Sequence, residues 1–240
     1  SGDGGDEMFA GYERYSEIMK HEHLRARIPS FVRKLLLPFQ SVYPVNFKGR
    51  ALLENMNLDF QTAACNSFFY FGSRHKAAIY GDDFQAYLAS QFRTDKIFGA
   101  FFDTCGSSEA LSRLQYVDYK SYLVDDICVK VDRMSMAHAL EVRAPLLDHK
   151  LIELVATMPS GFKLKNGRKK HLFKEFLSRK LPQSVVNRPK RGFGVPLSSW
   201  FRNEIKGLFE GVLRDGKLAK RGYFNVGYLE RLWSEQQGDT

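Results

Sequence analysis

Apolar side chains recur at helical spacing in successive segments of this chain, and proline or glycine stops several of these segments. Side chains three and four residues apart share one face of a helix, so the pattern predicts amphipathic helices. Strand signals are few. We therefore predict a mainly α-helical chain whose core is formed by the stripes, including one long helix after Pro196. The stripes run over Phe84–Phe92, Ile127–Leu140, Leu147–Met158, Leu172–Leu177, Leu197–Val212 and Tyr228–Trp233.

The segments between the stripes are less regular. Residues 12–37 predict one or two short basic helices, and residues 38–60, which hold two prolines and a glycine, predict irregular structure. The aromatic run Phe68–Phe71 predicts a strand or a buried turn. The serine pair Ser107–Ser108 is expected to cap a helix that continues to about Leu123.

The composition restricts the class of protein. The chain has 240 residues, of which 44% are hydrophobic, enough to bury a core in one large domain or two small ones. Its net charge of +9 fits either an anionic partner or an ordinary basic surface. No run approaches the ~20 apolar residues of a membrane helix, so no membrane span is expected. Three cysteines without a C-x-x-C pair predict buried thiols in a reducing cytoplasm rather than a zinc site.

The segment Ser1–Glu7 combines three glycines with three acidic residues ahead of a predicted helix. Glycine lets a backbone approach a ligand closely, and successive N–H groups in such a loop, with the helix N-terminus behind them, attract anions. Its carboxylates are suited to Mg²⁺, which bridges to phosphate oxygens. The alternative is an acidic turn whose carboxylates stabilise the helix dipole.

Three later segments are also rich in charge. Tyr122–Asp148 places eight charged residues among apolar ones, which predicts either a site or mutually paired buried charges; His138 within it is expected to be a hydrogen-bonded structural residue. In Leu164–Lys180, a basic block precedes a helix, where the dipole disfavours cations, so either an external anion or a solvated basic face is predicted. Asn187–Leu197 predicts a shaped loop that contacts an anion or packs on the surface.

These four segments, in this order, resemble the synthetase domain of the asparagine synthetases of the glutamine-hydrolysing class. The resemblance implies that residues 1–240 form a single partial domain, the helical C-terminal portion of an α/β, Rossmann-like domain of the adenine nucleotide α-hydrolase kind. It also implies that an upstream phosphate-binding loop and a glutaminase domain lie outside the chain. The matching motifs are Ser1–Glu7 with Phe9 and Gly11–Tyr12, Asp125–Asp126 with Asp132–Met136 and Glu141–Asp148, Lys170 at a helix start, and Arg188–Pro196.

The resemblance further implies a reaction. Members of the family use ATP to activate the side-chain carboxylate of aspartate as β-aspartyl-AMP, which ammonia from glutamine converts to asparagine. Asp3 is expected at the acidic position where the intermediate forms, although many members have glutamate there. Asp6 is expected to bind Mg²⁺, and Lys170 to offset negative charge on the phosphates. The residues expected to contact the nucleotide are Ser1, Gly2, Gly4 and Gly5.

The same resemblance implies a cytoplasmic protein that binds aspartate, ATP and ammonia, needs neither membrane nor nucleic acid, and is compatible with a homodimer. Two other functions stay open. One is another ATP-dependent amidotransferase of the same domain family, such as a β-lactam synthetase, because the shared motifs bind ATP rather than the acceptor. The other is a basic helical nucleic-acid-binding module, which a steep salt dependence of binding would reveal.

Overall fold

The computed structural model describes residues 1–240 except 36–37, 39–49, 70, 92–93, 189–193 and 239–240. The described residues are mainly helical and form no strand, which confirms the predicted mainly α-helical chain. The only β-type pairs among them are isolated bridges, Tyr80 with Phe224 and Lys165 with Arg168. None of the described helices has both the length and the hydropathy that a membrane span requires.

The chain forms two compact units, a large unit of Ser1–Phe68 with Asp95–Arg188 and a small unit of Phe69–Thr94 with Pro189–Thr240. The helices of the large unit are α1 (Gly5–Met8), α2 (Glu13–Arg27), α3 (Ser30–Leu35), α4 (Arg50–Asn55), α5 (Phe60–Phe68), α8 (Thr94–Thr104), α9 (Ala110–Lys120), a π-helix (Tyr122–Cys128), α10 (Val129–Met136), a 3-10 helix (Pro145–Leu147), α11 (His149–Thr157), α12 (Ser160–Lys163), α13 (His171–Ser178) and α14 (Gln183–Val186).

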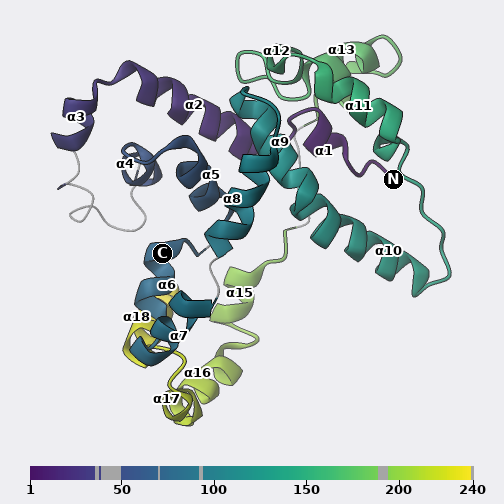
Figure 1. The fold of residues 1–240 in the computed structure, drawn as a ribbon. Coiled ribbons are helices and arrows are strands. Elements are labelled where there is room, and N and C mark those ends of the chain that lie inside the picture. The colour runs from purple at the N-terminus through teal and green to yellow at the C-terminus, as the bar shows by residue number, and fades with distance from the viewer. Residues whose placement is uncertain (36–37, 39–49, 70, 92–93, 189–193, 239–240) are drawn as a thin grey trace. The chain divides into compact units, whose positions relative to one another are not determined.

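Helix α9 lies at the centre of the large unit, with α1 and α2 packed beside it (Figure 1). Its buried residues Leu111, Leu114 and Val117 face this packing, as does Tyr15 of α2. A second cluster forms where Met8, Phe9 and Val155 are buried together. There the rings of Phe9 and Phe173 stack with their centroids 4.8 Å apart, which ties the end of α1 to α13.

The helices of the small unit are α6 (Ser73–Ile79), α7 (Asp82–Gln91), α15 (Leu197–Arg202), α16 (Lys206–Arg214), α17 (Lys217–Arg221) and α18 (Val226–Gly238). Its core is aromatic: the ring of Phe209 lies 4.6 Å from Trp233 and 5.4 Å from Phe201, centroid to centroid. Two backbone hydrogen bonds, from Gly81 N–H to the Tyr223 carbonyl (3.0 Å) and from Asn225 N–H to the Ile79 carbonyl (2.8 Å), join α6 to the segment before α18.

The helical stripes predicted α7, α11, α13 and α18 correctly, although Phe92 lies outside the described residues. The single long helix over 197–212 is wrong, because the chain breaks at Asn203 between α15 and α16. The Asn203 side chain donates to the Ser199 carbonyl (3.0 Å), so a short polar side chain competes there with the backbone ladder.

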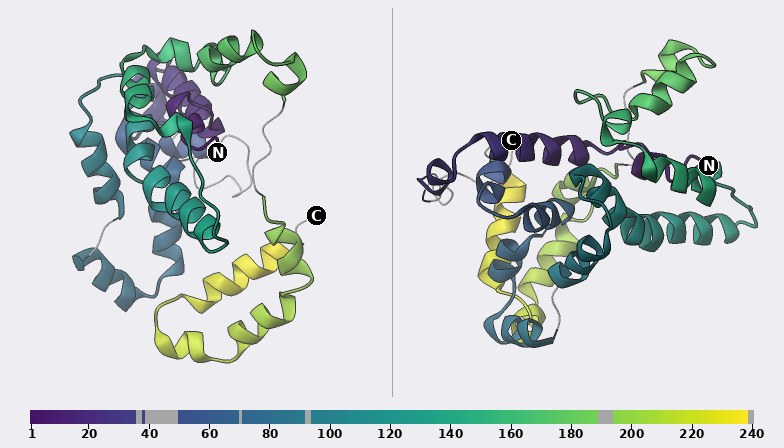
Figure 2. Two further views of the ribbon diagram at one scale, coloured as in Figure 1. Left: turned by 90° about the vertical axis from the view of Figure 1, so that its right-hand side faces the viewer. Right: turned by 45° about the horizontal axis from the view of Figure 1, so that its top comes forward.

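Three other local predictions need correction. Residues 38–60 are not irregular throughout, because α4 occupies part of them; Phe68 ends α5, and no strand follows among the described residues. The serine pair does not cap α9: Glu109 holds the N-cap position without a side-chain cap. The stripe expected to reach Leu140 ends at Met136, the last residue of α10. The chain then returns to α11 through an extended segment (Figure 2).

The cysteines also differ from expectation. Cys65 is buried, whereas Cys105 and Cys128 are free and partly exposed. The prediction of three buried thiols is therefore wrong for two of them. Cys128 ends the π-helix near the N-terminal loop, and burial, with the charges of Asp3 and Glu7, raises the pKa of its thiol.

Candidate functional site

The glycine-rich N-terminal loop, Ser1–Glu7, packs against the charged segment Tyr122–Asp148. Gly4 has a left-handed backbone (φ 84°), and a Cβ atom there would lie 2.2 Å from Cδ2 of Leu147. A Cβ atom on Gly5 would lie 2.8 Å from Cδ1 of Leu146. The left-handed backbone requires glycine at position 4, and the close approach of the 3-10 helix leaves little room for a side chain at either position.

The first three residues form the more open part of this loop. Ser1 and Gly2 are exposed, and nothing lies within 4 Å of a Cβ atom built on Gly2. The Ser1 hydroxyl donates to Oδ2 of Asp3 (2.5 Å), and the Ser1 nitrogen donates to the Arg143 carbonyl (2.5 Å). The loop thus presents one hydroxyl and one carboxylate together at the surface, next to Arg143.

Asp6 and Lys170 are brought together by the fold. Nζ of Lys170 lies 3.0 Å from Oδ1 of Asp6, and the two side chains are 27% and 26% exposed. Lys170 is the N-cap of α13 with a left-handed backbone (φ 53°), a conformation uncommon for residues other than glycine. Its N–H donates to the Phe9 carbonyl (3.0 Å), so both its backbone and its side chain contact the α1 segment.

Gly11 allows this pair to form. A Cβ atom built on Gly11 would lie 1.8 Å from Oδ1 of Asp6 and 2.3 Å from Cε of Lys170. The Gly11 N–H also donates to the Asp6 carbonyl (2.7 Å). Gly11 belongs to a matching motif, but the sequence indicates no role for it. Its position after the loop does not reveal that it lies against Asp6 and Lys170.

The rest of the basic block has partners within the chain. Lys169 forms an ion pair with Glu13, and Arg168 lies 2.7 Å from Glu175. These two cations are therefore accounted for without an external anion, and both pairs are partly exposed, where ion pairs contribute little to stability. Of the three cations Arg168, Lys169 and Lys170, Lys170 is the one that contacts the N-terminal loop, through Asp6.

Glu7 is buried behind the loop. Its side chain accepts a hydrogen bond from the Tyr12 hydroxyl, and the residue is 1% exposed. Burial raises the pKa of the Glu7 carboxyl above its ordinary value, and the Tyr12 bond only partly offsets this effect. Glu7 lies in the first turn of α1, as the alternative of an acidic turn predicts, but its side chain is buried rather than exposed to solvent.

A buried ion pair supports α2 against α9. Asp118 is fully buried and accepts from Nη2 of Arg14 (2.6 Å) and from the Tyr15 hydroxyl. Burial raises the pKa of Asp118, while the charge of Arg14 opposes the rise. The guanidinium also lies 4.4 Å from the ring centroid of Tyr12 and 5.1 Å from that of Tyr122. This network could not be predicted from the sequence, because no local pattern sets these residues apart.

The charges of Tyr122–Asp148 are mostly exposed, so the prediction of buried pairs is wrong. Lys130 and Asp126 form an exposed ion pair at 3.3 Å, and Arg143 pairs with Glu141. Asp148 instead caps α11, accepting from the Lys150 N–H (2.9 Å).

Two further expectations fall on exposed or undescribed residues. His138 is exposed and makes no side-chain hydrogen bond to a described residue, contrary to its predicted structural role. In the segment Asn187–Leu197, Arg188 is exposed, whereas Lys190 and Arg191 lie outside the described residues.

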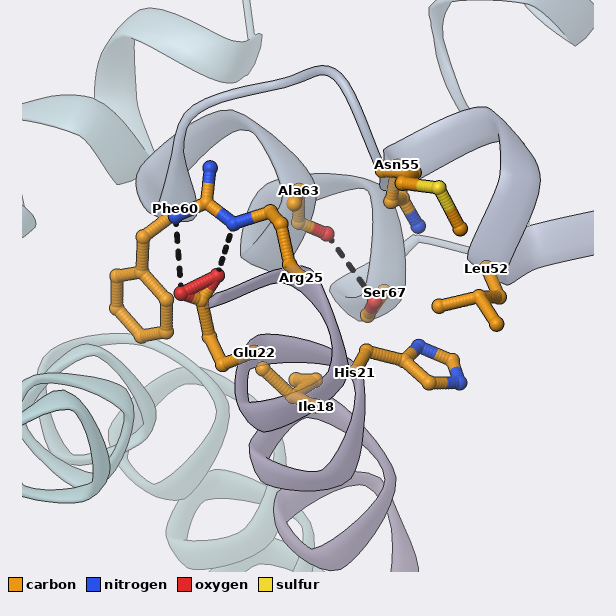
Figure 3. Close-up of a pocket in the computed structure, with 10 residues that line it drawn as sticks. Ile18, His21, Glu22, Arg25, Leu52, Asn55, Phe60, Ala63 and Ser67 are labelled. Atoms are coloured by element: carbon orange, nitrogen blue, oxygen red, sulfur yellow. Dashed lines mark hydrogen bonds and ion pairs between the residues drawn. The ribbon is translucent and has the colours of Figure 1, made fainter. Parts of the chain in front are cut away.

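A cavity between α2, α4 and α5 is separate from this site (Figure 3). Its volume of about 20 Å³ suits a single water rather than a substrate. On its wall Arg25 makes two contacts with Glu22, at 2.5 and 2.9 Å, and donates to the Leu58 carbonyl (2.6 Å). Among the described residues, no cluster of three or more histidine, cysteine or acidic side chains is arranged to hold a metal.

Comparisons with known proteins agree on one family. A family model described as asparagine synthase matches residues 1–240. The chain is 29% identical to the glutamine-hydrolyzing asparagine synthetase 1 of Bacillus subtilis (strain 168), over 100% of this chain and 37% of that protein. It is 27% identical to a putative glutamine-hydrolyzing asparagine synthetase of Mycobacterium tuberculosis (strain H37Rv), over 95% of this chain and 32% of that protein.

The human glutamine-hydrolyzing asparagine synthetase shares 35% identity over 88 residues, which is 34% of this chain and 15% of that protein. The chain thus spans about a third of the length of the bacterial relatives it matches, 37% and 32%. No solved structure matches the chain.

Proposed function

The chain belongs to the asparagine synthase family, and from this premise we propose that the protein containing it makes asparagine from aspartate. ATP would activate the aspartate side chain, and ammonia released from glutamine would supply the amide nitrogen. The relatives that match the chain are named glutamine-hydrolyzing asparagine synthetases, which supports this choice of reaction.

The proposed reaction has two steps. An oxygen of the aspartate side-chain carboxylate attacks the α-phosphorus of ATP, and pyrophosphate leaves, which gives β-aspartyl-AMP. The nitrogen of ammonia then attacks the activated carbonyl carbon, loses a proton, and displaces AMP, which keeps the transferred carboxylate oxygen. The protein's task is mainly to position the reactants and stabilise charge.

The contact between Asp6 and Lys170 carries the proposal. It joins the acidic glycine loop to the basic N-cap of α13, two segments that the resemblance assigns to one nucleotide site. A compact ammonium at the edge of a loop with exposed backbone would neutralise charge that develops on the phosphates. Ser1, Gly2, Gly4 and Gly5 would supply the loop, of which Ser1 and Gly2 are accessible in this structure.

The residues fit Mg²⁺ only together with a nucleotide. Mg²⁺ sites at phosphates use one or two protein carboxylates and take their other ligands from phosphate and water. Asp6 provides one such carboxylate, and Asp3, in the same loop, would stand at the acidic position where the intermediate forms. When bound, the ion would neutralise phosphate charge; Lys170, already 3.0 Å from Asp6, would act on the same phosphates.

The proposal extends to the rest of the protein. Residues 1–240 would be the helical part of one Rossmann-like synthetase domain, completed by an upstream phosphate-binding loop and supplied by a glutaminase domain. The chain covers only 37% and 32% of the lengths of the two bacterial relatives, which supports this division. The whole protein would act in the cytoplasm. It would also form a homodimer, which sedimentation of the full-length protein would test.

The experiment is pyrophosphate release by the full-length protein with ATP, Mg²⁺ and a panel of carboxylic acids. Aspartate should stimulate release, and Asp6→Asn should reduce it much more than it lowers thermal stability. Stimulation by a different acid, such as a β-lactam precursor, would assign the protein to another ATP-dependent amidotransferase. Release unchanged in Asp6→Asn at low Mg²⁺ would remove Asp6 from the site.

A further inference from the structure

The carbonyl groups of the α1 segment have identifiable hydrogen-bond partners. Those of Gly4, Gly5 and Asp6 accept from backbone N–H groups of Met8, Phe9 and Gly11, at 2.9, 3.3 and 2.7 Å. The Phe9 carbonyl accepts from the N–H of Lys170. A helix of four residues is too short to be stable alone, so the remaining carbonyls of its last turn need partners from elsewhere.

Gln115 satisfies the two remaining carbonyls. Its Nε2 donates to the carbonyls of Glu7 (2.5 Å) and Met8 (2.8 Å). An amide group has two N–H donors, so both are used on α1. Gln115 lies in α9 and is 3% exposed, which places the bonds out of reach of competing water.

The other end of the same amide holds the segment that leads to Lys170. Oε1 of Gln115 accepts from Nζ of Lys163 (3.3 Å), the last residue of α12. Lys163 is only 3% exposed, and burial lowers the pKa of its ammonium group, with the charge of Glu109 acting in the opposite direction. Burying an ammonium is unfavourable for stability, so its placement against Gln115 needs a reason other than stability.

We infer that Gln115 is a positioning residue of the proposed adenylation site, because its one buried amide fixes α1, which carries Asp6, relative to the segment between Lys163 and Lys170. Lys163 acts with it as the second anchor. The inference rests on the proposed function for its chemical consequence. That Gln115 and Lys163 hold the Asp6 and Lys170 segments together follows from the hydrogen bonds alone and does not depend on the proposed function.

Lys163→Met in the full-length protein separates positioning from stability. The change removes a buried charge and replaces it with an apolar side chain of similar length, so thermal stability should stay equal or rise. The kcat for pyrophosphate release should nevertheless fall about 10- to 100-fold, because displacement of about 1 Å in a reacting constellation has effects of this size. Equal stability with unchanged kcat would overturn the inference.

Gln115→Met tests the central residue, and Gln61→Met is its matched control. Gln61 donates from Nε2 to the Gly99 carbonyl (3.2 Å) in the same unit, and its hydrogen bonds to described residues do not involve α1 or α13. Gln115→Met should lower kcat about 10- to 100-fold, whereas Gln61→Met should leave it within about threefold. In a Lys170→Ala background the effect of Gln115→Met on kcat should be clearly smaller than in wild type, because only the displacement of Asp6 then matters; a loss that multiplies in full with that of Lys170→Ala would show a purely structural role.

Hydrogen exchange provides a readout independent of activity. The Lys170 amide, bonded to the Phe9 carbonyl, should exchange about tenfold faster or more in Gln115→Met and in Lys163→Met, but not in Gln61→Met. Unchanged exchange in both variants would overturn the inference. If wild-type protein releases no pyrophosphate with aspartate, the proposed function fails by itself, and the exchange measurement still decides whether Gln115 holds the two segments together.

Discussion

Replacing Gly11 with alanine is expected to break the contact between Asp6 and Lys170 without unfolding the protein. The new methyl carbon would lie 1.8 Å from Oδ1 of Asp6 and 2.3 Å from Cε of Lys170. Ordinary contacts of a carbon atom are about 3.5 Å, so these side chains must each retreat by more than about 1 Å. Because Gly11 does not adopt a left-handed backbone, alanine introduces steric crowding alone.

The expected magnitudes follow from which atoms must move. Both crowded atoms lie towards the ends of side chains, which can rotate away, so the loss of stability should stay at or below the ~1–3 kcal/mol typical of overpacking. Gly→Ala also lowers the entropy of the unfolded chain and returns ~0.4–1 kcal/mol. Displacing both charged groups by about 1 Å should slow adenylation about 100-fold, or ~2.7 kcal/mol in the barrier.

The assay compares pyrophosphate release and thermal unfolding of full-length Gly11→Ala with those of Gly106→Ala. Gly106 is a matched control, because nothing lies within 4 Å of a Cβ atom there. Gly11→Ala should keep its melting transition and lose adenylation, whereas Gly106→Ala should keep both. A folded Gly11→Ala protein with adenylation within about threefold of wild type would refute the assignment of the Asp6–Lys170 contact to the site.

Three further predictions concern side chains around the loop. Lys170→Ala should slow adenylation about 30- to 1000-fold, or roughly 2–4 kcal/mol, whereas Lys169→Ala should stay near wild type; equal rates would show that the basic block is only a solvated face. Arg14→Ala should lower the free energy of unfolding by ~3–5 kcal/mol, since Asp118 stays fully buried without its counter-ion, and a loss below about 1 kcal/mol in denaturant unfolding would contradict this. Burial raises the pKa of the Glu7 carboxyl above 4.5, so the folded state favours its protonated form. The free energy of unfolding of the wild type should therefore fall as pH rises from about 4.5 through the raised pKa, and Glu7→Gln should lack this decline. Parallel stability curves for the two proteins would contradict a buried, titrating Glu7.

Sequence periodicity predicted those helices whose apolar face meets a core. The stripe Leu147–Met158 becomes α11, and Leu172–Leu177 becomes α13, because both have apolar residues at three- and four-residue spacing and proline beyond their ends. It failed where local hydrogen bonds or packing decide. The π-helix Tyr122–Cys128 and the break at Asn203 have no signal in the apolar pattern, which continues through both.

The sequence selected the residues of the proposed site, but it could not predict their contacts. Motif resemblance selected Asp6 and Lys170, but their separation along the chain hides the ion pair, which only the fold brings to 3.0 Å. Gln115 could not be selected, because an amide within an amphipathic helix looks like any surface glutamine. Its importance follows from accounting for the carbonyl groups of a short helix, which requires coordinates.

The central claim is that ATP activates the side-chain carboxylate of aspartate by adenylation. Its most direct test uses aspartate labelled with oxygen-18 in that carboxylate, incubated with the full-length protein, ATP, Mg²⁺ and glutamine. Attack of the carboxylate oxygen on the α-phosphorus leaves one labelled oxygen on the phosphate of AMP when ammonia displaces it. The account predicts one oxygen-18 atom in the recovered AMP for each asparagine formed; unlabelled AMP, or label found in inorganic phosphate, would contradict it.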